Sequence, residues 1–252
     1  MDWLILFLSG VIGGVLNSIA GGGSFITFPA LLFAGVPPIA ANATNTFASC
    51  AGYISGAYAL RHEIQSGTKQ LKLTIALCVI GGGIGAFLLL HTPEALFTQS
   101  VPWLLLLAAL LFTFGGTLNK WLKQATAKHK HATSAGAFFS ALLLLIVCIY
   151  GGYFNAGLGI VTLSYLALAG YTNINVMNGI KLLVSTCASL AAIVFFIVNG
   201  SIDWPSGMAV LMGTLVGGYY SAKISRRIPQ QYVRNTVIIA SFLITAYFFY
   251  AS

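Results

Sequence analysis

Residues 13–24 read Gly-Gly-Val-Leu-Asn-Ser-Ile-Ala-Gly-Gly-Gly-Ser, and they interrupt an apolar stretch that extends from about residue 3 to residue 34. A helix needs about 20 residues to cross 30 Å of hydrocarbon, so this stretch is too long for one straight crossing. Glycine runs lower helix propensity and let two backbones approach closely. We therefore expect two half-helices joined by a non-helical break at Gly21–Ser24.

The composition makes lipid the solvent for much of this chain. Of the 252 residues, 58% are hydrophobic and only 6% are charged, and the mean hydropathy is +0.90. A soluble domain carries about 25% charged residues. The net charge of +8 does not indicate nucleic-acid binding, because the basic residues cluster between apolar stretches, as they do in cytoplasmic loops.

Seven more apolar stretches follow the first one. The fifth of the eight is also too long for one crossing, and Gly157-Leu158-Gly159 interrupts it. The other six have roughly the length of one transmembrane helix. The sequence thus predicts an all-α integral membrane protein with a single transmembrane domain over residues 1–252. The eight stretches lie at about residues 3–34, 40–60, 71–91, 101–119, 134–169, 174–198, 205–222 and 232–251.

Pairs of similar segments divide the chain into two halves. Gly13–Asn17 resembles Gly151–Asn155 at a spacing of 138 residues, and Gly81–Gly85 resembles Gly213–Gly217 at a spacing of 132 residues. Each pair occupies the same place in a block of four stretches, which indicates an internal duplication. Repeat 1 would cover about residues 1–128 and repeat 2 about residues 129–252.

The charges of the loops predict that the two repeats are inverted in the bilayer. The loop after the second stretch contains Arg61, Lys69 and Lys72, whereas its counterpart at residues 199–203 has no basic residue. The bias reverses again after the third and seventh stretches, as inverted halves require. Inversion needs an odd number of crossings per half. We therefore expect the two broken stretches to be re-entrant hairpins, with both termini outside, and a tilted, broken crossing is the alternative.

The two breaks are candidate anion sites. A half-helix that begins near Ser24 would point its positive end at the middle of the bilayer, and glycines would let an anion approach the backbone. The alternative is that the glycines only permit close helix packing. The asparagines before the breaks either bind the ligand or satisfy free backbone groups. The residues concerned are Gly21, Gly22, Gly23, Ser24, Gly157 and Gly159, with Asn17 and Asn155 before them.

Lys181 is the one basic residue that lies well inside an apolar stretch. A charge at such a place is costly and usually functional. The four acidic residues, Asp2, Glu63, Glu94 and Asp203, lie at stretch ends or in loops, so an anionic ligand would supply the missing counter-charge. Snorkelling is the alternative, since about 10 Å of helix separates Lys181 from the start of its stretch.

Lys181 belongs to a polar stripe. Asn178, Lys181 and Ser185 follow an i, i+3, i+7 spacing and therefore share one helical face. Inverted-repeat transporters place substrate where two repeat-related segments face each other across a pseudo-twofold axis. Hydrogen bonding between helices is the alternative role. The first half has the same stripe 136 residues earlier, at Asn42, Asn45 and Ser49.

Several chemical motifs are missing from the sequence. No Walker loop, GxSxG or HExxH pattern occurs, so we expect no ATP motor, no enzymatic activity and no cofactor. The four cysteines lie inside apolar stretches without a CxxC spacing, and we expect neither disulfides nor a metal site.

The motif that runs from Gly14 to Ser24 is followed by Pro29-Ala-Leu-Leu and by Gly35-Val36-Pro37 before an Ala/Asn/Thr-rich helix start. In the second half, Asn178-Gly-Ile-Lys181-Leu-Leu is the matching segment. These residues resemble the TauE/SafE sulfite-exporter family of membrane transporters, and the resemblance covers essentially the whole chain.

The resemblance implies a secondary transporter in a bacterial inner membrane. Its substrate would be a small sulfur-containing or carboxylated anion, such as sulfite or sulfoacetate, and its flux would be coupled to an ion. The expected partners are this anion and the lipid bilayer. An anion channel, or a membrane partner subunit without transport of its own, are the alternatives. The resemblance leaves open whether the protein forms a homo-oligomer.

Overall fold

The structure is a computed structural model that describes residues 2–19, 22–67, 71–126, 134–224 and 230–251. These residues form helices joined by short loops and contain no strand, which confirms the predicted all-α class. The helices are α1 (Asp2–Ile19), α2 (Ser24–Phe33), α3 (Pro38–Ala59), α4 (Arg61–Gly67), α5 (Leu71–Leu90), α6 (Glu94–Thr126), α7 (Ser134–Tyr153), α8 (Leu158–Leu168), α9 (Ile174–Val198), α10 (Trp204–Ile224) and α11 (Gln230–Ala251).

Each of the two long apolar stretches forms two helices. In the first stretch α2 begins at Ser24, and in the fifth stretch α8 begins at Leu158, directly after Gly157. Gly157 has a φ of 84°, a left-handed conformation that favours glycine. With 10 and 11 residues, α2 and α8 are each about half as long as a helix that crosses the hydrocarbon.

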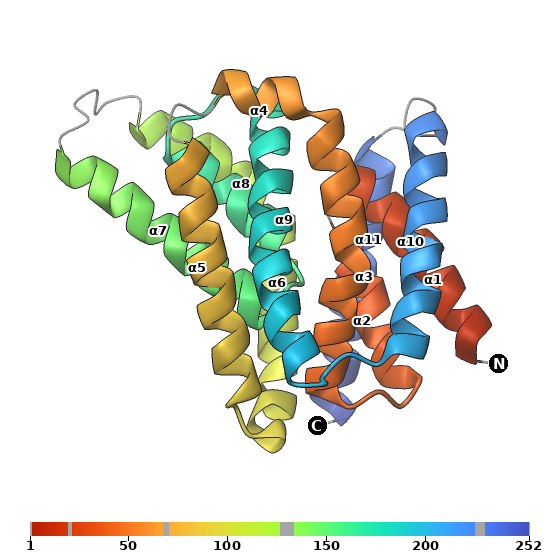
Figure 1. Ribbon diagram of the computed structural model, residues 1–252. Helices are drawn as coiled ribbons and strands as arrows, with labels where there is room; N and C mark the ends of the chain where they lie inside the picture. Colours follow the sequence, from red (N-terminus) through yellow and green to blue (C-terminus); the bar gives the residue numbers. More distant parts are fainter. Residues whose placement is uncertain (1, 20–21, 68–70, 127–133, 225–229, 252) are drawn as a thin grey trace.

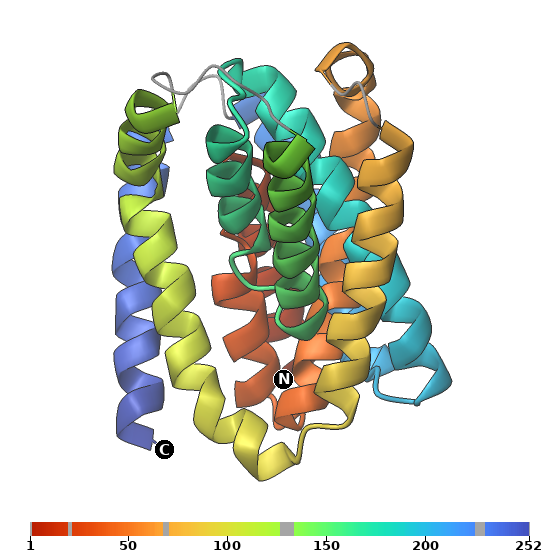
Figure 2. The ribbon, with the colours of Figure 1, turned by 90° about the vertical axis from the view of Figure 1, so that its left-hand side faces the viewer.

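The two ends of the molecule serve to describe the direction of each half-helix. In Figure 1, α4 lies at one end of the molecule, and both chain ends lie towards the other. Helix α3 begins at the chain-end side and leads to α4, whereas α9 begins at the α4 side and leads away from it (Figures 1 and 2). The loops before α3 and α9 are short, so α2 returns to the chain-end side and α8 returns to the α4 side.

Two pairs of helices pack backbone against backbone along glycines, in what we call the glycine seams. In the seam between α1 and α10, a Cβ atom on Gly213 would lie 2.8 Å from the backbone nitrogen of Val11. In the seam between α5 and α7, a Cβ atom on Gly85 would lie 2.6 Å from the backbone nitrogen of Tyr153. Both distances are too short for a side chain, so these glycines set how closely the helices approach. The seams contain Gly10, Gly14, Gly213 and Gly217, and Gly81, Gly85 and Gly152, whereas Gly82 of α5 faces Ala188 of α9.

Large apolar side chains cover much of the outer surface. Leu4, Trp103, Phe138 and Leu243 are each more than half exposed, while phenylalanines from several helices fill the interior. A surface of this kind suits lipid rather than water. By length and hydropathy alone, α5 and residues 175–198 of α9 could each cross a membrane.

Two helices differ from what the apolar stretches predicted. Helix α4 was not expected, because Arg61–Gly67 is mostly polar, yet Ile64 is buried and packs against the backbone of Gly179. Helix α6 begins at Glu94 and ends at Thr126, whereas the apolar stretch covers about residues 101–119. Hydropathy identifies only the part of a helix that lies in lipid, and it misses polar turns at either end.

The seam between α5 and α7 gives a test of the fold. We expect Gly85→Ala to lower the free energy of unfolding by about 1–3 kcal/mol, because its methyl group would meet the backbone of α7. Gly83→Ala is the matched control in the same helix, since its methyl group would meet only the ring of Phe195 at 3.2 Å. Thermal unfolding of the purified protein in detergent measures both. Equal midpoints for the two variants would contradict the described packing.

Candidate functional site

The first turns of α2 and α8 carry backbone groups that the helices themselves cannot satisfy. Bonds to Gly22, Gly23, Asn155 and Gly157 hold these turns, and no side chain caps either of them. In Figure 2, α8 (green-blue) lies above α2 (red-orange), and both begin near the middle of the molecule. Phe28 of α2 packs against Phe154 in the second break, with ring centroids 5.4 Å apart. The positive ends of both half-helices therefore lie in the interior of the protein.

Asn155, just before α8, is the centre of a buried hydrogen-bond network. The Tyr53 hydroxyl donates to Asn155 Oδ1 at 2.9 Å, and Asn155 Nδ2 donates to Ser189 Oγ at 2.9 Å. All three side chains are at least 93% buried. The network joins α3, the second break and α9.

Tyr53 also brings the first break into this network. Its hydroxyl lies close to the side chains of Asn17, Ser24 and Ser49. On the same helix, a Cβ atom on Gly52 would lie 3.8 Å from Asn17 Nδ2. Polar side chains of the first break and of the α3 stripe therefore lie beside the bonded network of Tyr53, Asn155 and Ser189. We call Tyr53, Asn155, Ser189, Asn17, Ser24 and Ser49 the central cluster.

Asn42 and Asn45 lie in the first half of α3 and are fully buried. Asn42 Nδ2 donates to the carbonyl of Tyr153 at 3.0 Å, and Asn45 Oδ1 accepts from the Thr27 hydroxyl in the first turn of α2. The other two amide atoms, Asn42 Oδ1 and Asn45 Nδ2, have no hydrogen-bond partner in the part of the chain that the structure describes. An unpaired buried polar atom costs about 1–3 kcal/mol, so these atoms are available to a ligand.

Lys181 pairs with its own stripe. Its ammonium donates to Asn178 Oδ1 at 3.3 Å, one turn closer to the start of α9, while Ser185 is fully buried. The Lys181 side chain is partly exposed, and among the described residues no carboxylate forms an ion pair with it. Among the described residues, no hydrogen bond joins Lys181 to the central cluster, although its helix also carries Ser189.

The glycines of the breaks have different surroundings. A Cβ atom on Gly23 would lie 2.9 Å from the Cβ atom of Asn17, so Gly23 packs closely against α1. Gly157 approaches Ala108 of α6, where a Cβ atom would lie 2.8 Å from that methyl group. Gly22 is buried at the start of α2, Gly159 is half-buried in the first turn of α8, and Gly21 lies outside the described residues. Both glycines thus pack closely against a neighbouring helix, and their role in ligand binding stays a prediction.

Tyr53, Ser189 and Thr27 are not among the site residues that the sequence predicted. A signal for the first two exists, because Tyr53 and Ser189 lie four residues after Ser49 and Ser185 and extend each stripe by one turn. Tyr53 and Ser189 also keep the spacing of 136 residues that relates the stripes. Thr27 has no such signal, because its partner Asn45 belongs to another helix.

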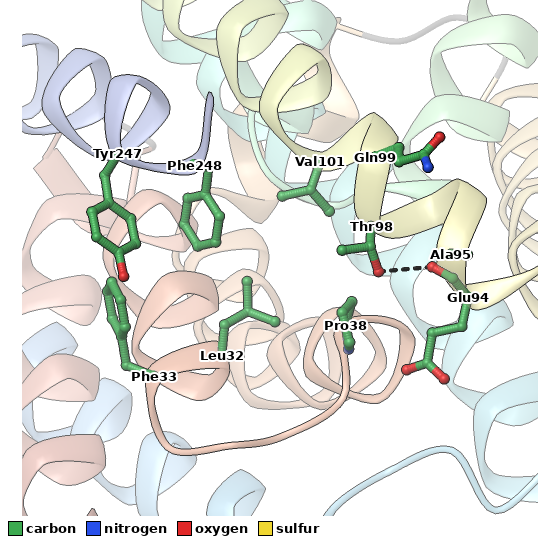
Figure 3. Close-up of a pocket in the computed structure, with 10 residues that line it drawn as sticks. All are labelled: Leu32, Phe33, Pro38, Glu94, Ala95, Thr98, Gln99, Val101, Tyr247 and Phe248. Carbon is green, nitrogen blue, oxygen red and sulfur yellow. Dashed lines mark hydrogen bonds between the residues drawn. The ribbon is translucent and has the colours of Figure 1, made fainter. Parts of the chain in front are cut away.

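A separate pocket of about 810 Å³ opens at the chain-end side of the molecule. Figure 3 shows Leu32 and Phe33 of α2 facing Tyr247 and Phe248 of α11 across it, with Glu94 at its edge. No residue of the central cluster lines this pocket. It is mostly apolar, and it is therefore not the candidate site. Among the described residues, no group of three or more His, Cys, Asp or Glu side chains could hold a metal ion.

Comparison with known proteins identifies the family. A sequence model of the TauE/SafE sulfite exporter family matches residues 6–248. The chain belongs to this family. It is 28% identical over 250 residues to the "probable membrane transporter protein YfcA" of Escherichia coli K12, covering 98% of this chain and 90% of that protein.

Other TauE/SafE-like relatives are described in the same terms. A "probable membrane transporter protein" of Haemophilus influenzae is 27% identical, over 96% of this chain and 92% of the relative. One of Bacillus subtilis, YdhB, is 23% identical, over 94% of both chains. No solved structure matches the chain. The chain is thus a multi-pass membrane transporter of the TauE/SafE family, as the sequence motifs predicted.

The Tyr53 hydroxyl gives a test of the central cluster. We expect Tyr53→Phe to leave Asn155 Oδ1 unpaired and to lower the free energy of unfolding by about 1–3 kcal/mol. In a protein of this size, each kcal/mol lowers the unfolding midpoint by about 2–4 °C. Tyr58→Phe, on the same helix but largely exposed, is the control and should not change it. A Tyr53→Phe protein as stable as wild type would show that the network carries no energy.

Proposed function

We propose that the chain is a secondary transporter that moves a small sulfur oxyanion or organosulfonate, such as sulfite or sulfoacetate, across the bacterial inner membrane by alternating access. The observation that carries the proposal is a set of unmatched positive and donor groups. Lys181 has no carboxylate partner among the described residues, and the buried Asn45 Nδ2 has no acceptor. An anion beside either group would complete it. Family membership supports a transporter rather than an enzyme.

Inverted repeats over about residues 1–128 and 129–252 are part of this proposal. The glycine seams support it, because equivalent glycines have equivalent neighbours. Gly217 of α10 meets the carbonyl of Val11, and Gly85 of α5, 132 residues earlier, meets the carbonyl of Ile149. Val11 and Ile149 are themselves 138 residues apart, which is the spacing of the two hairpins. Each hairpin thus packs against a helix of the other repeat.

The proposed substrate site lies where the two breaks meet the two stripes. The ends of α2 and α8 supply positive potential, worth about half a charge each, and the central cluster supplies hydroxyl and amide donors. Non-helical backbone at this depth is tolerated only where protein buries it or where it lines a wet cavity. Lys181 would meet the anion on the α4 side, and its counterpart Asn45 on the chain-end side.

An anion channel uses the same groups, and it differs from a transporter in showing flux without saturation or counterflow. A membrane partner subunit would not transport alone, and its stripes would only join helices. The unpaired Asn45 and Asn42 atoms favour a ligand over such a role, since groups that join helices would be paired.

Lys181 gives the first test of the proposed function. We expect one sulfur anion from a panel of sulfite, sulfate, thiosulfate, sulfoacetate, simple carboxylates and chloride to raise the unfolding temperature of the protein in detergent. At about 100 times its dissociation constant, such a ligand stabilises the fold by roughly 2.7 kcal/mol. Lys181→Ala should abolish this shift, and Lys72→Ala, which removes an exposed lysine, should keep it. Normal anion binding by Lys181→Ala, or no shift with any anion, would reject the proposed site.

The proposed orientation puts α4 and the basic loops in the cytoplasm and both chain ends outside. We expect Ser201→Cys, between α9 and α10, to react with a membrane-impermeant maleimide on intact cells. Gln65→Cys in α4 is exposed but should react only after lysis. The unsubstituted protein is the control for its own four cysteines. Reaction of both positions from the same side would exclude the inverted arrangement.

A further inference from the structure

The four carboxylate side chains of the chain all lie away from the central cluster. Asp2 is the first residue of α1, Glu63 belongs to α4, Glu94 begins α6, and Asp203 directly precedes α10. In Figure 1, α4 is at one end of the molecule and the starts of α6 and α10 are at the other. A positively charged group inside the protein therefore finds no carboxylate at the middle of the helices.

The pocket that Glu94 lines lies away from the two breaks. Glu94 lies at the edge of the pocket between α2, α6 and α11, at the chain-end side (Figure 3). The side chains that share the pocket with it are mainly apolar or aromatic, and none belongs to the central cluster. Glu94 thus cannot neutralise a charge that sits between the two breaks.

The groups between the breaks favour negative charge and offer a cation no carboxylate, although the buried, unpaired Asn42 Oδ1 can accept one hydrogen bond. Both half-helices begin there, so their positive ends repel an ammonium group. Tyr53, Asn155 and Ser189 pair with one another and carry no charge. Lys181 adds a full positive charge on the same stripe as Ser189. An ammonium buried here would lose its hydration without gaining a counter-charge, at a cost of several kcal/mol.

We propose that the site admits organosulfonate anions that lack an ammonium group and excludes zwitterions such as taurine. This rests on the proposed function, and it adds a rule of selection. The negative sulfonate alone is recognised by the helix ends and Lys181, so the other end of the substrate must be neutral or negative. The unpaired, fully buried Asn45 Nδ2 next to Thr27 is a further donor of the same kind.

Taurine and isethionate form the matched pair that tests this inference. Both are two-carbon sulfonates of similar size, and they differ in an ammonium group against a hydroxyl group. Titration of the purified protein by thermal shift, checked by uptake into proteoliposomes, should give isethionate a dissociation constant about 100-fold or more below that of taurine. Equal binding of the two would overturn the inference. Binding of sulfite without isethionate would also overturn it and would leave the proposed function intact.

Asn45→Asp tests whether the absence of a carboxylate is what excludes taurine. The substitution keeps the shape of the side chain and the oxygen that accepts from Thr27, but it replaces the unpaired donor by a carboxylate oxygen. We expect the preference for isethionate over taurine to fall by about tenfold or more in this variant. An unchanged preference would mean that the absence of a carboxylate is not what excludes taurine. If the variant does not fold, the comparison of the two ligands on the unsubstituted protein still decides the inference.

Discussion

Backbone N–H and C=O groups need partners inside a membrane, and this requirement determines the arrangement around both breaks. Half-helices α2 and α8 begin in the interior, and no described side chain caps their first turns. Beside the second break, Asn42 Nδ2 of α3 donates to the carbonyl of Tyr153, and the Tyr150 hydroxyl of α7 donates to the carbonyl of Ala156. Asn155, Tyr53 and Ser189 bond to one another beside the second break, and Tyr53 reaches towards the first. The first turns of both half-helices keep N–H groups that no described side chain caps, and such groups attract an anion.

The glycine seams provide close helix packing, and the central cluster provides buried polar groups. Glycines bring α1 against α10 and α5 against α7, so that each hairpin has a rigid support. The polar residues of α3 and α9 then face the breaks from the other side.

Much of this could be predicted from the sequence. Hydropathy predicted the eight apolar stretches, because a helix must have a certain length to cross lipid. Glycine runs predicted that the first and fifth stretches each divide into two helices. The family followed from the Gly14–Ser24 motif. The polar helix α4 and the hydrogen bonds of Tyr53 did not follow, because they depend on which helices become neighbours. For the same reason the sequence could not show that Gly23 packs closely against Asn17, and a role of Gly23 in ligand binding stays a prediction.

The glycine seams also bear on how the protein is made. Helix α1 leaves the ribosome early, but the helix whose backbone it needs, α10, begins only at Trp204. At synthesis rates of about 5–20 residues per second, α1 waits on the order of 10 s or more with its bare glycine face towards lipid. Helix α5 must likewise wait for α7. Neither half is therefore expected to mature alone, and a chaperone or insertase that shields small-residue faces would act on α1 longest.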